Sequence, residues 1–122
     1  MNKISFDFDS TLSREDVQSY AKELINREFD IWICTSRFES AWNDDLFDVA
    51  NDLGIKKENI YFCNMSNKSE FLYNKDFIFH IDDDDIELSF IKSDTNVSPI
   101  YLTENMNWKS DCENAILKYE RN

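Results

Sequence analysis

The chain has 122 residues, of which 42% are hydrophobic and 15% aromatic, and this apolar content excludes a disordered protein. Its length fits one domain, residues 1–122, built around a single core. The net charge of −12 weighs against an extended nucleic-acid groove, because such a groove needs clustered Lys and Arg.

The N-terminal residues predict a strand followed by a helix. In residues 3–8 apolar and polar side chains alternate with the period of a strand. Ser13 followed by Asp16 resembles a capping box, a pattern that starts many helices. The predicted helix then carries apolar residues at helical spacing, namely Val17, Tyr20, Ala21, Leu24 and Ile25.

A second strand and a second helix follow. Residues 29–34 form an apolar run, which predicts a strand that ends just before Thr35. Residues 39–53 predict a helix that ends at Gly54, the one glycine of the chain, where a left-handed C-terminal cap would need it. The apolar stripe of this helix consists of Trp42, Leu46, Val49, Ala50 and Leu53.

The rest of the chain continues the alternation of strands and helices. The predicted elements are a strand at 60–63, a helix at 67–73, a strand at 77–81, a helix at 86–91, a strand at 100–102 and a helix at 111–119. Such alternation indicates an α/β protein whose helices cover both faces of the sheet. We therefore predict a three-layer, Rossmann-like sandwich with a five-stranded, mainly parallel sheet.

Polar side chains follow several of the predicted strands. They are Asp7 and Asp9 after the first strand, Thr35 after the second, and Asp82 and Asp83 after the fourth. Lys68 begins the helix after the third strand. Because ligands bind beyond the carboxyl ends of parallel strands, we expect these residues to converge at one edge of the sheet.

These residue types suit phosphoryl transfer, which needs a nucleophile, proton transfer and positive charge around the phosphoryl group. Asp7 and Asp9 offer two carboxylates where the chain leaves the sheet and can curl. Lys68 offers a permanent cation, while Asp82 and Asp83 add the oxygen ligands that Mg²⁺ prefers. Crowded carboxylates repel one another, so the arrangement calls for a metal ion.

The order of these motifs resembles the haloacid dehalogenase superfamily of phosphotransferases. The resemblance consists of Asp7-x-Asp9-x-Thr11, a hydrophobic strand followed by Thr35, then Lys68, then a hydrophobic strand followed by Asp82-Asp83, and it covers the chain from residue 4 to residue 91. Each motif alone is weak, but four in this order are a strong signal. An acid at the position of Asp9 goes with phosphoryl transfer in that family, whereas the dehalogenases lack it.

The resemblance implies a role for each residue of the site. Asp7 would form an aspartyl-phosphate, and Asp9 would protonate the leaving group and then activate water. Thr35 and Lys68 would hold the phosphate. Mg²⁺ would bind Asp7, the backbone carbonyl of Asp9 and one carboxylate of the pair Asp82 and Asp83, with Asp83 preferred as the direct ligand. Lys75 competes with Lys68, but it precedes a strand rather than opening a helix at the active edge.

The short connections predict an open site. Only 23 residues, Leu12–Cys34, separate the first motif from Thr35, which leaves no room for the cap domain that the family often inserts there. An open site suits a large phosphorylated substrate, such as a nucleotide or a nucleic-acid end, or completion by a second copy in a homo-oligomer. The candidate substrate-binding residues are Thr11, Ser36 and Arg37.

Other functions fit the sequence less well. A calcium loop fails because Thr11 and Leu12 stand where Asp and Gly belong. A signalling receiver domain would carry its phosphorylated Asp after the third strand, where the chain has Cys63-Asn64. A cysteine phosphatase needs five residues between Cys and Arg, and only two separate Cys34 from Arg37. A catalytically idle protein of the same fold, used for binding or inhibition, stays open.

The remaining features predict an ordinary cytoplasmic protein. The three cysteines, Cys34, Cys63 and Cys112, form no C-x-x-C pair, which indicates reduced, mostly buried thiols. No apolar run approaches the ~18 residues of a membrane span, and no signal peptide begins the sequence. His80 and Trp42 are both predicted to be core residues.

Overall fold

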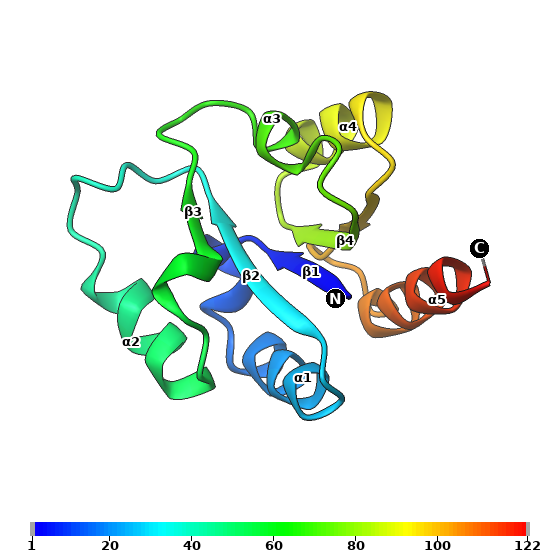
Figure 1. Ribbon diagram of the computed structural model, residues 1–122, viewed down its shortest axis with the longest axis horizontal. Helices are drawn as coiled ribbons and strands as arrows, with labels where there is room; N and C mark the ends of the chain where they lie inside the picture. Colours follow the sequence, from blue (N-terminus) through cyan, green and yellow to red (C-terminus); the bar gives the residue numbers. More distant parts are fainter. Residues whose placement is uncertain (1, 122) are drawn as a thin grey trace.

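The computed structural model describes residues 2–121 as a five-stranded sheet flanked by helices (Figure 1). The strands are β1 (Lys3–Phe6), β2 (Asp30–Thr35), β3 (Ile60–Phe62), β4 (Phe77–Asp82) and β5 (Ser98–Tyr101). They lie in the order β3-β2-β1-β4-β5, and every pairing is parallel. The predicted α/β sandwich is confirmed, with a wholly parallel sheet.

Helices cover both faces of this sheet. They are α1 (Glu15–Asn26), α2 (Asp44–Leu53), α3 (Lys68–Leu72), α4 (Asp85–Asp94) and α5 (Trp108–Glu120), with short turns η1 (Phe8–Leu12) and η2 (Lys57–Asn59). One buried apolar cluster joins the sheet to α1, α2 and α5, and a second joins it to α3 and α4. In Figure 1 the pair α3 and α4 accordingly lies on the opposite side of the strands from α1.

The central strands are buried on both faces, as expected for a parallel sheet between two helical layers. All six residues of β4 are buried, and three of the four residues of β1 are buried. In contrast, β3 is an edge strand without a fully buried residue. The polar residues within β1 and β4, Ser5 and His80, therefore need partners inside the protein.

Helix α1 starts differently from the prediction. The capping box of Ser13 and Asp16 is wrong, since α1 begins at Glu15 and has no side-chain cap. The Ser13 hydroxyl instead accepts the backbone N–H of Ser10 at 3.1 Å, and the Asp16 carboxylate pairs with Arg14. Both side chains therefore bind residues of the turn that precedes the helix instead of capping it.

Helix α2 begins at Asp44, five residues later than predicted, and Trp42 is not a core residue because it is 70% exposed. The reason is the buried side chain of Asn43. Its amide donates to the carbonyl oxygens of Phe38, Glu39 and Ala41 at 3.1, 3.3 and 3.1 Å, which holds this segment in a non-helical turn.

Two further expectations concern the cysteines and the membrane. Cys34, Cys63 and Cys112 are all buried free thiols, as predicted. None of the helices in residues 2–121 has the length and apolar composition needed to cross a bilayer.

The C-terminal cap of α2, which the sequence predicts at Gly54, leads to a testable prediction of stability. Gly54 caps the helix with φ of +80°, and a Cβ added there would meet nothing within 4 Å. We expect Gly54→Ala to lower the free energy of unfolding by about 1 kcal/mol, because only the left-handed backbone opposes the methyl group. Urea unfolding measures the change. Gly54→Asn should cost less than Gly54→Ala, and an unchanged stability in Gly54→Ala would contradict the cap.

Candidate active site

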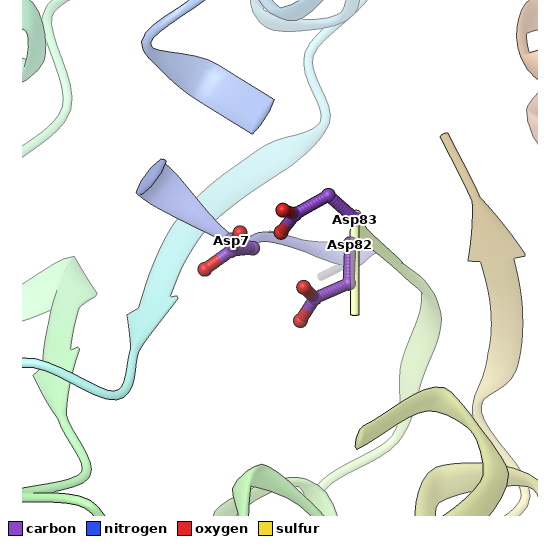
Figure 2. A group of neighbouring side chains, drawn as sticks. All are labelled: Asp7, Asp82 and Asp83. Carbon is purple, nitrogen blue, oxygen red and sulfur yellow. The ribbon is translucent and has the colours of Figure 1, made fainter. Parts of the chain in front are cut away.

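Three carboxylates meet where β1 and β4 end. Asp7 directly follows β1, Asp82 is the last residue of β4, and Asp83 is the next residue. The backbone N–H of Asp7 donates to the carbonyl oxygen of Ile81 at 2.9 Å, which ties the two strand ends together. One oxygen from each carboxylate lies within 4.8 Å of the others, and Figure 2 shows the three side chains next to one another.

Lys68 holds two of these carboxylates. It is the first residue of α3, and its Nζ donates to Asp7 Oδ1 at 2.8 Å and to Asp82 Oδ2 at 2.6 Å. The side chain is only 3% exposed. Burial alone would lower the pKa of Lys68, but the two adjacent carboxylates outweigh it and raise that pKa above its usual range. Lys68 is therefore a permanent cation, and the structure places it, rather than Lys75, in the site.

Asp7 sits in an environment that opposes its charge. Burial and the neighbouring charge of Asp82 raise its pKa well above the ordinary value, while the ammonium of Lys68 acts in the opposite direction. The Thr11 hydroxyl donates to Asp7 Oδ2 at 3.0 Å, and Lys68 holds Oδ1. Both oxygens are thereby fixed in direction. A divalent cation beside Asp7 would favour its ionised form further.

Asp82 is saturated with hydrogen bonds. Its Oδ2 accepts from Lys68 and from His80 Nε2 at 2.8 Å, and its Oδ1 accepts the backbone N–H of Asp84 at 3.1 Å. Burial disfavours its charge, but the bonds from His80 and Lys68 prevail and hold the pKa of Asp82 below the ordinary value. Asp82 thus has little capacity left for a metal ion.

His80 is the core histidine that the sequence predicts. It is fully buried, and burial lowers its pKa, so the ring is neutral near pH 7. A neutral ring that donates from Nε2 to Asp82 accepts at Nδ1, where the hydroxyl of Ser5 lies at 2.8 Å. The buried polar chain therefore runs from Ser5 through His80 and Asp82 to Lys68.

Asp83 has the least buried carboxylate of the cluster. Burial of the carboxyl group is the largest contribution to its raised pKa, and the charge of Asp82 acts in the same direction. Of the three carboxylates, Asp7 and Asp83 are consequently the two that fit direct metal ligands, with the hard oxygen donors that Mg²⁺ prefers. Asp82 fits a supporting position behind them.

The segment after β1 forms a tight turn that carries Asp9 to the rim of the pocket. Asp9 and Ser10 leave helical geometry, with a φ of +58° at Ser10, so η1 is a tight turn rather than a regular helix. Thr11 is buried and bonds Asp7, so its hydroxyl orients the first carboxylate. The side chain of Asp9 is 57% exposed and faces Arg37.

Arg37 lies between two carboxylates. Its guanidinium donates to Asp9 at 2.7 and 3.0 Å and to Asp45, in the first turn of α2, at 2.7 and 2.9 Å. The hydrogen bonds with Asp45 and Asp9 raise the pKa of Arg37, and the bond from Arg37 lowers that of Asp45. The guanidinium also stacks over the ring of Phe8, with 5.0 Å to the centroid. Arg37 is therefore held on both sides.

The pocket at this edge has a volume of about 200 Å³. It is lined by Asp7, Asp9, Ser36, Met65, Ser66, Lys68, Asp82, Asp83, Asp84 and Glu87. Ser36 thus reaches the pocket, whereas Thr35 and Arg37 are not part of its wall. Thr35 is fully buried, and its Oγ1 accepts the backbone N–H of Arg37 at 3.2 Å.

Several residues of the site were not predicted. Glu87 accepts the backbone N–H of Lys68 at 2.9 Å, and Asp84 caps α4 by accepting the N–H groups of Ile86 and Glu87. The run Asp82–Asp85 pointed to the region of Asp84, but Glu87 and Asp45 have no sequence signal of their own. Their roles depend on contacts between separate elements.

Comparisons with known proteins add no relative. No family model matches the chain, and no curated protein or solved structure matches it. The site geometry and the order of the sequence motifs are therefore the grounds for a functional proposal.

The buried position of Lys68 leads to a stability prediction. We expect Lys68→Met to lower the free energy of unfolding by about 3 kcal/mol, because it leaves Asp7 and Asp82 buried without their cation. Urea unfolding in EDTA at pH 7 measures the loss without help from metal ions. Lys75→Met is the matched control and should cost under about 1 kcal/mol, since the Lys75 ammonium contacts only a carbonyl and an aromatic ring. Equal losses in the two variants would contradict the central role of Lys68.

Proposed function

We propose that the protein is a magnesium-dependent phosphomonoester hydrolase of the haloacid dehalogenase type that acts through an aspartyl-phosphate. The observation that carries this proposal is the cluster of Asp7, Asp82 and Asp83 around the buried ammonium of Lys68. It combines a nucleophile, hard metal ligands and a fixed cation within one pocket. Phosphorylated substrates that fit an open site, nucleotides and nucleic-acid ends among them, are the candidates.

Asp7 is the proposed nucleophile. One of its oxygens attacks phosphorus, so that the new Asp7 oxygen–phosphorus bond forms as the bond to the leaving oxygen breaks. Asp9 gives its proton to that leaving oxygen. A water molecule then attacks the phosphorus of the aspartyl-phosphate while Asp9 takes its proton. Inorganic phosphate leaves, and the carboxylate of Asp7 is restored.

The other residues prepare this reaction. Lys68 opposes the rise in the pKa of Asp7 and offsets negative charge on the phosphoryl group, and Thr11 fixes the direction of the Asp7 carboxylate. The residues proposed to hold Mg²⁺ are Asp7, Asp83 and the backbone carbonyl of Asp9. The metal ion would supply positive charge to the phosphoryl oxygens. Asp82 acts through Lys68, whose ammonium it keeps in place.

Arg37 and Asp45 are proposed positioning residues for Asp9. A guanidinium paired with Asp9 alone would be held in place from one side only. Because Arg37 also binds Asp45, it keeps one carboxylate partner when Asp9 becomes protonated. The shared guanidinium thus allows Asp9 to act as an acid without leaving a half-buried charge unpaired.

The nucleophile gives the direct test of the function. We expect the wild type to release phosphate from an aryl phosphate in Mg²⁺, and Asp7→Asn to release it at least about a thousandfold more slowly, since the amide cannot form the aspartyl-phosphate. EDTA should abolish the wild-type rate, and added Mg²⁺ should restore it.

The control is the fold of the variant, checked by its unfolding midpoint. Equal rates in the wild type and Asp7→Asn, or a rate that EDTA leaves unchanged, would contradict the proposal. A folded wild type that releases no phosphate from any substrate would favour the catalytically idle alternative.

Asp45 gives a second prediction, based on the leaving group. In Asp45→Asn, Arg37 keeps only Asp9 as a charged partner, so the guanidinium no longer holds the Asp9 side chain from a fixed position. We expect kcat for an alkyl phosphate to fall about tenfold, because a poor leaving group needs the acid. The rate for 4-nitrophenyl phosphate should change less than about twofold, because that leaving group departs without a proton.

Asp44→Asn is the matched control, since Asp44 also lies in the first turn of α2 but is exposed and makes no contact with Arg37. It should leave both rates unchanged. If Asp45→Asn slowed both substrates equally, Asp45 would have a structural role only.

A further inference from the structure

More negative than positive side chains line the pocket, and this excess of negative charge affects which substrates the pocket can bind. Six carboxylates line the pocket, from Asp7, Asp9, Asp82, Asp83, Asp84 and Glu87. The one cationic side chain in the lining is that of Lys68. A phosphatase must nevertheless attract the phosphate group itself, so the position of each charge determines what else the site accepts.

Every positive group near the pocket is already matched by negative charge. Lys68 is shared by Asp7 and Asp82. With a divalent cation bound, Lys68 and the cation would carry three positive charges, which Asp7, Asp82 and Asp83 offset together. Arg37 is shared by Asp9 and Asp45, so this trio keeps an excess of one negative charge.

Two more carboxylates at the pocket have no cationic partner within salt-bridge distance in residues 2–121. Asp84 is exposed and accepts only backbone N–H groups at the start of α4. Glu87 is partly buried and accepts the backbone N–H of Lys68. Even with the metal bound, the pocket therefore stays negative, and its neutral members are Ser36, Met65 and Ser66.

We propose that this site selects phosphomonoesters whose leaving group is neutral or cationic, and discriminates against leaving groups that carry phosphates or carboxylates of their own. This inference rests on the proposed phosphatase function. The transferred phosphate would bind beside Lys68 and the residues proposed to hold the metal, where the pocket offers it positive charge. The leaving group extends toward the rim, where Asp9, Asp84 and Glu87 repel additional negative charge. A nucleoside monophosphate fits this rule, whereas nucleoside di- and triphosphates and oligonucleotide ends violate it.

Three aryl phosphates with the same ring test the rule. They are the phosphate esters of tyramine, 4-ethylphenol and 4-hydroxyphenylacetate, whose para side chains are cationic, neutral and anionic. Their leaving groups are similar phenols, so differences in kcat/KM report the charge of the side chain. We expect kcat/KM to fall about threefold at each step from cationic to anionic, as Coulomb interactions across ~6 to 8 Å of water imply. The differences should shrink at high salt.

Two variants test whether the discrimination between the three esters comes from the charges that line the pocket. Asp84→Asn keeps a side-chain oxygen to cap α4 but removes one charge, and it should reduce the discrimination about twofold. Asp85→Asn makes the same change at the next residue, which does not line the pocket, and should leave the discrimination as it is. Equal kcat/KM values for the three esters, or a preference for the anionic one, would overturn the inference while leaving the phosphatase function intact. If none of the esters were hydrolysed, the phosphatase function would fail and the inference with it.

Discussion

The ammonium of Lys68 is the interaction on which the candidate site depends. It comes from α3, on one face of the sheet, and reaches Asp7 and Asp82 at the ends of two neighbouring strands. A buried ammonium without carboxylates would be costly, and so would two adjacent buried carboxylates without a cation. Each group therefore requires the others, and the requirement fixes where α3 packs. The same contacts bring together the proposed nucleophile, Asp7, its counter-charge and carboxylates that could hold a metal ion.

The number of hydrogen bonds that each polar side chain makes separates the groups that hold the structure together from those that remain available to a ligand. Within residues 2–121 no buried side-chain nitrogen or oxygen lacks a partner. The chain from Ser5 through His80 to Asp82 is saturated, so these groups have few bonds left to offer a ligand. Asp83 lies beside them with spare capacity. The adjacent aspartates thus differ in their contacts because only Asp82 bonds the buried chain, a difference that two identical letters in the sequence do not express.

Much of the site was predictable because its residues are placed by local patterns. Asp7 and Asp82 follow apolar strands, and Lys68 begins a helix, so the parallel topology alone brings them to one edge. The start of α2 was not predictable, because the side chain of Asn43 holds the preceding turn through three carbonyl groups. The pairing of Arg37 with Asp45 likewise joins a loop to a helix. Neither contact follows from periodicity, since each depends on where two elements meet.

The site combines two electrostatic environments. Asp7, Lys68 and Asp82 are nearly excluded from water, so their interactions are strong and little affected by salt. Asp9 and Asp84 are exposed at the rim, where each charge has a modest and screened effect. All elements of residues 2–121 belong to the sheet and its flanking layers, so none of them forms a separate domain over that rim. The proposed reaction would therefore combine a buried nucleophile and cation with an exposed acid, Asp9, while Asp84 would act on the rest of a substrate through its charge.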